Sequence, residues 1–165
     1  MPTPNILLAR IDNRLVHGQV GMTWVNTISA NLVIVANDKV AQDSVQQNLM
    51  EMVIPETVGI RFFSLEKTIR IIGKAAPWQK ILLVVRTPQD ALRLTVGGVP
   101  VKKWNIGNLH FAEGKQQLSE TISVSEDDVD AFNKLNKLGV ALEVQGIPSE
   151  HAADMMSLLK KYKKS

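Results

Sequence analysis

Residues 12–21, Asp12-Asn13-Arg14-Leu15-Val16-His17-Gly18-Gln19-Val20-Gly21, lie between two apolar patterns of different periodicity. Upstream, residues 5–11 form a short apolar run of the kind that becomes a buried parallel strand. Downstream, apolar residues recur at helical spacing (Val20, Trp24, Val25 and Ile28), which predicts a helix beginning near Gly18. His17 is therefore expected between a strand's carboxyl end and a helix's amino end, where open parallel sheets bind ligands and where helix N–H groups attract anions.

The rest of the chain continues this alternation of strands and helices. Further strands are predicted over residues 31–36, 59–64, 80–86, 101–106, 121–124 and 140–144, and helices over 38–52, 64–75, 87–95, 125–138 and 149–163. The run at 80–86 is the most apolar and is expected inside the sheet. The pattern predicts an α/β fold with an open, mostly parallel, twisted sheet and helices on both faces. Because no linker or repeat divides it, the chain is expected to form one domain over residues 1–165.

Composition excludes several classes of site. The chain has 165 residues, no cysteine and a formal net charge of +3, so it offers no disulfide framework, thiolate nucleophile or thiolate metal site. The amino terminus lacks the pattern of a secretory signal, and no apolar run reaches the roughly 18 residues of a membrane span, so we expect a soluble cytoplasmic protein. The lysine-rich tail at 160–164 is interpreted as a frayed, solvated helix end, with docking to an acidic partner or a membrane surface left open.

The loop before the first helix can support phosphoryl chemistry. The neutral ring of His17 is a good phosphoryl acceptor, and the positive potential at a helix start favours that neutral form. Arg14 adds a planar, permanently charged group suited to phosphate, while the backbone N–H groups of Gly18 and Gln19 can cradle phosphoryl oxygens. Asp12 can orient Arg14 or accept a proton from the imidazole. His17, Arg14 and Asp12 are thus the candidate catalytic residues.

Spacing alone also allows a plainer interpretation, in which His17 is a hydrogen-bonded loop histidine and Arg14 a surface residue. The absence of several sequence motifs limits the kinds of phosphoryl transfer that the chain can perform. No phosphate-binding loop for a nucleoside triphosphate, no dinucleotide-binding turn and no metal-binding helix motif occurs in the sequence. An ATP-driven kinase is therefore disfavoured, and neither a cofactor nor a metal is called for.

Other polar residues are expected along the same edge of the sheet. Asn37 and Asp38 follow the second strand, where helix capping by Asp38 competes with phosphate binding as the explanation. Arg86 follows the fourth strand and could meet an incoming phosphoryl group. Asn108 and His110 belong to a patterned turn, for which a structural role is favoured. His151 is expected to be exposed, and the three tryptophans to be core or interface residues (Trp24, Trp78 and Trp104).

Residues 10–20, Arg-Ile-Asp-Asn-Arg-Leu-Val-His-Gly-Gln-Val, closely resemble the active-site signature of the IIB component of the mannose/sorbose family of the bacterial sugar phosphotransferase system. The resemblance extends through residues 36–43, 46–50, 59–63, 80–85 and 105–110, and its first two blocks point to the N-acetylgalactosamine or galactosamine type. It implies an open, mainly parallel sheet flanked by helices. It also implies a phosphocarrier in which Nδ1 of His17 receives the phosphoryl group.

The resemblance also implies partners. The phosphoryl group comes from a phosphohistidine of a IIA component and passes to a sugar held by the membrane components IIC and IID, so sugar choice is made outside this chain and the protein works next to its transporter. A docking surface for IIA is expected around His17, with Leu15, Val16 and Val20 as its apolar part if they are exposed. The sequence does not decide whether the protein forms a homodimer. The residues also allow two other functions. One is a noncatalytic module that binds a phosphorylated metabolite, and the other, which is disfavoured, is a nucleic-acid binder led by the lysine tail.

Overall fold

The strand, loop and helix predicted at the start of the chain form at the expected positions. The computed structural model describes residues 3–164, and for residues 19–22 it describes the backbone alone. Strand β1 spans Asn5–Asp12 and helix α1 spans Gly18–Ile28, so the loop that carries the candidate site is residues 13–17. The strand's apolar side chains and the helix's amphipathic spacing thus produce the predicted junction.

The remaining elements continue the alternation. The strands are β2 (Leu32–Ala36), β3 (Gly59–Phe63), β4 (Lys80–Val85), β5 (Lys103–Asn108), β6 (Gln116–Gln117), β7 (Ser123–Val124), β8 (Ala141–Val144) and β9 (Ala153–Asp154). The α-helices are α2 (Ser44–Glu51), α3 (Leu65–Ile71), α4 (Pro88–Val96), α5 (Glu126–Lys137) and α6 (Met155–Leu159), and short 3₁₀ turns occupy Val40–Gln42 and Ile72–Lys74.

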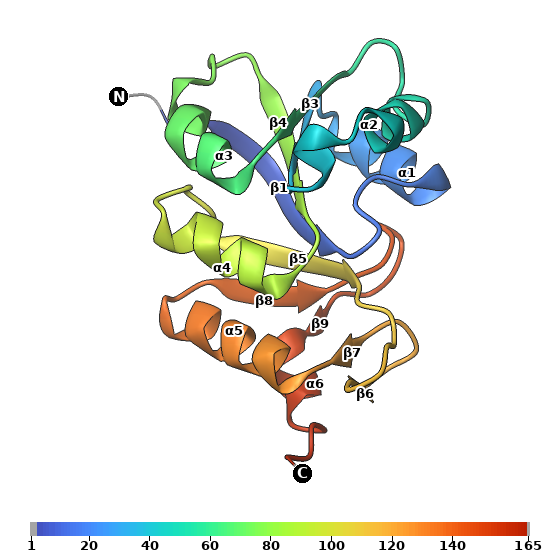
Figure 1. Ribbon diagram of the computed structural model, residues 1–165, viewed down its shortest axis with the longest axis vertical. Coiled ribbons are helices and arrows are strands. Elements are labelled where there is room, and N and C mark those ends of the chain that lie inside the picture. Colours follow the sequence, from blue (N-terminus) through green and yellow to red (C-terminus); the bar gives the residue numbers. More distant parts are fainter. Residues whose placement is uncertain (1–2, 165) are drawn as a thin grey trace.

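The described strands form a seven-stranded sheet in the order β3-β2-β4-β1-β5-β8-β9 and a separate β6-β7 ribbon (Figure 1). Every pairing in the larger sheet is parallel except that of β8 with β9. Strand β4 lies between β2 and β1, which confirms the interior position expected from its apolar sequence. The predicted open, mostly parallel α/β sheet is confirmed.

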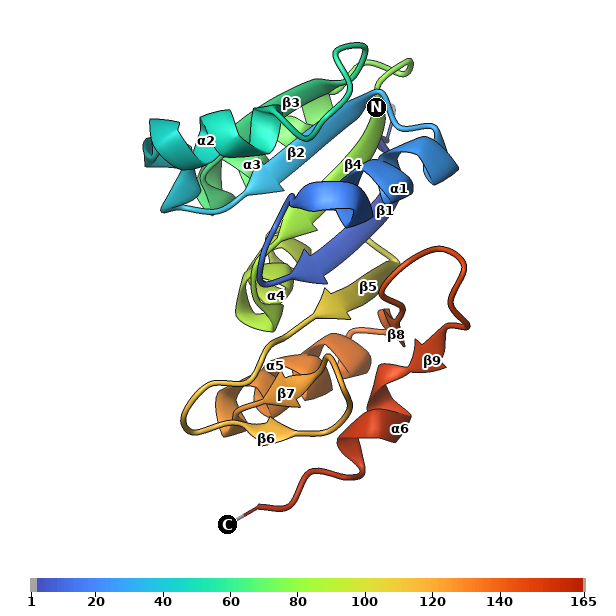
Figure 2. The same cartoon turned by 90° about the vertical axis from the view of Figure 1, so that its right-hand side faces the viewer.

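Helices cover both faces of the sheet (Figure 2). Alternate side chains of the central strands enter two apolar clusters, because successive strand residues point to opposite faces. One cluster joins Ile34, Leu83 and Ile11 with residues of α3, α4, α5 and α6. The other joins Val35 and Val84 with residues of α1 and α2. Residues 5–12 of β1 therefore contribute to both layers, and the strand's carboxyl end is held between them.

Two predicted helices are wrong in extent. The helix expected over residues 38–52 is divided, because Asp43 adopts an extended conformation and its side chain caps α2 at Gln46 N, 3.2 Å away. The helix expected over residues 149–163 is reduced to the short α6. Its first part is instead a loop and the strand β9, which pairs with β8, and the Asp154 side chain caps α6.

Candidate functional site

The carboxyl ends of β1, β2, β4 and β5 meet at one edge of the sheet, and the loop of residues 13–17 leaves from this edge. A tight turn starts the loop, with Leu15 N donating to the carbonyl of Asp12 at 2.9 Å. Leu15 has φ of 56°, in the left-handed region, and Gly18 has φ of 35°. His17 is the N-cap residue of α1. The sharp turn thus returns the chain so that His17 lies over the end of β1.

Asp12 is the hub of this loop. It is fully buried, and both of its carboxylate oxygens face nitrogen donors. Oδ2 lies 3.3 Å from Nη2 of Arg10 and 3.3 Å from Nε2 of His17. Oδ1 accepts from the backbone N of Arg14 at 3.0 Å and lies 3.5 Å from its Nε. One carboxylate therefore orders two arginines and the histidine.

The Asp12 carboxyl group stays ionised although it is buried. Burial by itself would raise the pKa of this carboxyl group, because the charged form loses hydration. The hydrogen bond with His17, the backbone hydrogen bond from Arg14 and the charge of Arg10 outweigh burial, and the pKa of Asp12 is lowered from its ordinary value. Asp12 is thus a carboxylate at neutral pH and can act only as a hydrogen-bond acceptor.

The contact with Asp12 selects one tautomer of His17. Because the carboxylate accepts, the Nε2 atom of His17 carries a proton and donates it to Oδ2. In the neutral ring, Nδ1 then holds the free lone pair. The side chain is 22% exposed, so the ring is fixed on one side and open to solvent on another. This geometry provides an oriented nitrogen nucleophile at the protein surface.

Two sources of positive potential lie beside the ring. The Arg14 side chain is 46% exposed and touches Asp12, so its guanidinium is tethered but accessible. The His17 side chain makes no capping hydrogen bond, so it does not occupy the N–H groups of the first turn of α1. Gly18 has open space where a Cβ would be. Gln19 belongs to α1, but its side chain lies outside the described residues.

Sequence reasoning assigned no role to Arg10. It is 4% exposed and lies inside β1, next to the candidate catalytic residues. Its Nη1 donates to the side chain of Asn105 and to the carbonyl of Gln145. The signal was a basic residue within an otherwise apolar strand, because a buried charge needs a partner. Asp12, two residues along the same strand, supplies it.

Arg86, Asn37 and Asp38 lie along the same edge, as expected, but hydrogen bonds place the last two in capping positions. Asn37 Oδ1 accepts from Val40 N at 3.0 Å. Asp38 Oδ1 accepts from Leu65 N at 2.9 Å, so it stabilises the start of α3 rather than its own helix. Arg86 follows β4, next to the β1 end that carries Asp12, and its Nε is buried with no hydrogen-bond partner among the described residues.

The patterned turn after β5 is tied to the site loop through Asn13. Asn108 Nδ2 donates to Asn13 Oδ1 at 2.7 Å, and the Asn13 side chain also contacts Nδ1 of His110. Asn13 N donates to the carbonyl of Asn108 at 3.0 Å. These bonds hold the loop against β5, in line with the structural role expected for Asn108 and His110.

The apolar residues near the site do not meet the condition set for a docking surface. Leu15 and Val16 are 3% and 6% exposed, so they are core residues and do not form an apolar docking surface. The left-handed turn directs them into the cluster beneath α1. The side chain of Val20 lies outside the described residues. Trp24 and Trp104 are buried as expected, whereas Trp78 is 75% exposed and is not a core residue.

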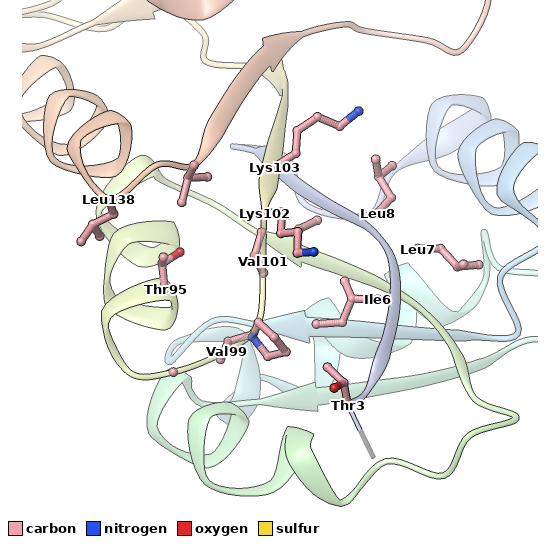
Figure 3. A pocket seen from close by; sticks show the side chains of 14 residues that line it. Thr3, Ile6, Leu7, Leu8, Thr95, Val99, Val101, Lys102, Lys103 and Leu138 are labelled. Atoms are coloured by element: carbon pink, nitrogen blue, oxygen red, sulfur yellow. The ribbon is translucent and has the colours of Figure 1, made fainter. Parts of the chain in front are cut away.

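The hollow beside His17 is too small for a sugar. Its volume is about 10 Å³, the room of one water molecule, with Arg10, Val16 and Trp24 in its wall. A hollow of about 570 Å³ lies at the opposite edge, where β1 and β5 begin, lined by residues such as Ile6, Val99 and Lys102 (Figure 3). The candidate site is therefore a surface site, with a partly exposed histidine and little enclosed space beside it.

The lysine-rich tail starts at Lys160, the C-cap residue of α6, and its lysines are exposed, in line with the expected solvated helix end. After α6 the chain continues without helical structure, and Lys163 exchanges hydrogen bonds with the side chain of Gln116 in β6. Lys164 lies 3.8 Å from Glu126. Within residues 3–164, no helix is long and apolar enough to cross a membrane, and no group of three or more histidine and acidic side chains could hold a metal ion.

Comparison with known proteins gives consistent matches over almost the whole chain. Residues 6–165 match the family described as PTS system sorbose subfamily IIB component. The chain is 57% identical over 156 residues to the N-acetylgalactosamine-specific phosphotransferase enzyme IIB component 2 of Escherichia coli K12, covering 94% of this chain and 99% of the relative. It is 37% identical to the mannose-specific EIIAB component of the same organism, covering 95% of this chain and 49% of that protein.

A solved structure has the same fold. The crystal structure of a PTS-dependent N-acetyl-galactosamine-IIB component from Streptococcus pyogenes superposes with a TM-score of 0.90 at 43% identity. The match covers 95% of this chain and 99% of that one. The fold described above is thus the same as that of this relative.

Proposed function

The chain belongs to the sorbose subfamily of IIB components of the sugar phosphotransferase system, and from this premise we propose that His17 carries the phosphoryl group. A IIB component is a phosphotransferase that acts in sugar transport. Our proposal goes further and names the atoms that accept, hold and release the phosphoryl group. It is based on the contacts of Asp12 with its neighbours.

The observation that carries the proposal is the contact of 3.3 Å between Nε2 of His17 and Oδ2 of Asp12. It fixes the proton on Nε2 and leaves Nδ1 as the nucleophile. Nδ1 attacks the phosphorus of a phosphohistidine on the donor, a new N–P bond forms, and the donor's N–P bond breaks with its electron pair returning to the donor nitrogen. The ring of His17 then bears a positive charge, which the buried carboxylate of Asp12 stabilises.

The incoming group also needs stabilisation of its negative charge. Arg14 is near enough to share Asp12 with His17 and exposed enough to turn toward phosphoryl oxygens. The N–H groups at the start of α1, including those of Gly18 and Gln19, add donors and the positive end of the helix dipole. Arg86 is a further candidate, because its buried Nε lacks a partner among the described residues.

The partners follow from the family. We infer that a IIA component donates the group and that membrane components IIC and IID hold the sugar, with this chain working at the cytoplasmic side of the transporter. Its similarity to a fused EIIAB component supports the pairing with IIA. The similarity to relatives named for N-acetylgalactosamine supports an amino sugar of that type as the substrate. The small hollow beside His17 supports a sugar held elsewhere.

The first experiment tests the phosphohistidine. The protein is incubated with phosphoenolpyruvate, the general phosphotransferase proteins and the cognate IIA, and its intact mass is followed. One acid-labile phosphoryl group is expected on the wild type and on His110→Ala, and none on His17→Ala. A mass gain that persists in His17→Ala would move the site to another residue.

The second experiment tests the sugar. Phosphorylated protein is added to membrane vesicles containing the matching IIC and IID, with N-acetylgalactosamine, galactosamine or mannose. Loss of the phosphoryl group from the protein, with appearance of the sugar phosphate, is expected with the first two sugars. Equal transfer to mannose would contradict the proposed substrate class while leaving the phosphocarrier role intact.

A further inference from the structure

We propose that Arg10 is the positioning residue of this site: it holds the Asp12 carboxylate, and through it the His17 ring, in the orientation that leaves Nδ1 free. The inference rests on the proposed function of His17 and adds a residue outside the loop that carries the chemistry. Arg10 does not face the incoming phosphoryl group, since it is buried within β1.

Both terminal nitrogens of the Arg10 guanidinium make hydrogen bonds to two acceptors each. Nη1 donates to the Asn105 side chain and, at 2.9 Å, to the carbonyl of Gln145. Nη2 donates to Asp12 at 3.3 Å and to the carbonyl of Gly146 at 2.8 Å. The planar group also lies 5.2 Å from the centre of the Trp24 ring. A side chain held from this many directions has one position.

That position determines where Oδ2 of Asp12 lies. The same oxygen receives the contacts from Arg10 Nη2 and from His17 Nε2, each at 3.3 Å. The His17 side chain is part exposed, so its ring orientation depends on this buried acceptor. Arg10 also contributes to the lowered pKa of Asp12, which keeps the acceptor charged. Displacing Arg10 therefore releases the ring of His17.

A second connection runs through the loop after β8. The carbonyl of Gly146 accepts from Arg10 and, at 2.9 Å, from Nε1 of Trp24 in α1. The loop is braced from within, because Gly146 N and the Gln145 side chain both bond to Glu150. The helix that begins after His17 and the carboxylate that orients His17 are thus attached to one rigid frame.

The geometry requires both an arginine at position 10 and a glycine at position 107. A lysine keeps the charge but supplies a single nitrogen, which cannot reach acceptors on two sides. A Cβ at Gly107 would overlap Nη2 and Cζ of Arg10, so any side chain there displaces the guanidinium. Gly107 thus leaves room for Arg10. Gly107→Ala displaces the Arg10 side chain while Asp12, Arg14 and His17 keep their own side chains.

The test uses Arg10→Lys and Gly107→Ala in the full chain, with Arg70→Lys and Gly73→Ala as matched controls. Arg70 is an exposed residue of α3, and a Cβ at Gly73 meets open space. Two measurements are made on each variant below its melting temperature. The ¹⁵N chemical shifts of the His17 ring report the tautomer, and phosphorylation rates over a range of phospho-IIA concentrations give the saturated rate and the KM.

In the wild type the ring is expected to be the Nε2-protonated tautomer, and in both variants a mixture of tautomers. The phosphorylation rate is expected to fall about 10²-fold in each, with an unchanged KM for phospho-IIA, because positioning rather than docking is lost. The controls should match the wild type. Variants that melt earlier but keep the wild-type tautomer and saturated rate would overturn the inference, since Arg10 would then be a structural residue only.

The double variant decides whether the two positions act through one group. Lysine leaves space where the guanidinium was, so Gly107→Ala should add little to Arg10→Lys, whereas independent effects would multiply. Multiplied effects on the rate would therefore contradict the mechanism. The ring shifts are measured without any phosphoryl donor, so they test Arg10 even if the proposed function fails. A wild type that accepts no phosphoryl group would reject the proposed function alone.

Discussion

Replacing Asp12 with asparagine is the most informative single perturbation of the site. The two side chains have nearly the same shape, but the amide has one acceptor oxygen where the carboxylate has two. Oδ2 faces donors of Arg10 and His17, and Oδ1 faces two donors of Arg14. Whichever way the amide turns, its NH₂ group meets nitrogen donors. The substitution therefore removes the charge of Asp12 and the contacts of one of its two oxygens.

The loss of unfolding free energy depends on whether the amide gives up the contact with Arg10 or the contact with Arg14. Arg10 is 4% exposed and cannot be rehydrated, whereas Arg14 is 46% exposed and can turn to solvent. The oxygen is thus expected to stay with Arg10, and the NH₂ group to displace Arg14. Removing one charge of a buried ion pair costs about 3–5 kcal/mol. Because one acceptor is retained, the expected loss is about 3 kcal/mol, or a melting temperature lowered by roughly 6–12 °C in a chain of this length.

The substitution should also lower the rate of phosphoryl transfer. The ring of phosphorylated His17 loses the carboxylate that balances its positive charge, and Arg14 loses the tether that holds it beside the ring. Losing one preorganised electrostatic group of this kind slows a reaction by about 10²–10³-fold. The assay is quenched-flow phosphorylation by phospho-IIA followed by intact mass, at a temperature where both proteins are folded. A rate within threefold of the wild type would refute the role given to Asp12.

The pH dependence gives an independent check on the same variant. The folded-state pKa of Asp12 lies below its ordinary value of 3.8, so its stabilisation is complete above that value and is lost as the pH falls through the lowered pKa. The difference in unfolding free energy between wild type and Asp12→Asn should be present at neutral pH and should shrink below about pH 4. Urea unfolding at several pH values measures it, with the exposed Asp127→Asn as control. A difference that grows as the pH falls below about 4 would refute the charged, hydrogen-bonded state.

Three further predictions concern single side chains. Arg14→Ala should slow phosphorylation by phospho-IIA about 10²-fold and change the melting temperature by no more than about 2 °C, because this arginine is 46% exposed. Burial raises the pKa of Asp90, so Asp90→Asn should stabilise the protein at pH 7, by under about 1 kcal/mol in urea unfolding, with the gain vanishing toward pH 3 where aspartate is protonated. Trp104 is fully buried and its Nε1 donates to Thr95 at 3.0 Å, so Trp104→Phe should lower the unfolding free energy by about 1–3 kcal/mol, and an unchanged value would contradict that packing.

The sequence predicted those parts of the structure that depend on local pattern. Apolar runs and Gly, Pro and cap residues located the strand before the site, the helix after it and the sheet edge on which His17 lies, because these signals act within a few residues. Of the two helices wrong in extent, the one over residues 38–52 was interrupted locally, by the extended Asp43 and its cap on α2, and the one over residues 149–163 by a longer-range pairing. Residues 153–154 pair with β8 instead of joining a helix, and such pairing leaves no periodic signal in the segment itself.

The same distinction applies to the site. His17, Arg14 and Asp12 are close in the chain, and a motif could indicate them together. Arg10 contacts Asn105 and the carbonyl of Gly146, which are 95 and 136 residues away. Its role depends on the parallel pairing of β1 with β5 and on the course of the loop after β8. The one sequence signal that could have pointed to Arg10 is its charge within an apolar strand, because a buried charge needs a partner.

The shape of the site suits the proposed task of passing a phosphoryl group between proteins. A histidine in a deep pocket could not meet a donor protein and then an acceptor protein, while a fully exposed one would lose the orientation that makes Nδ1 the nucleophile. Here the ring is 22% exposed and is held from beneath by a buried carboxylate. Asp12 and Arg10 are buried beneath the ring, whereas Arg14 is 46% exposed beside it. Orientation is therefore independent of either partner, and both partners can approach the same nitrogen.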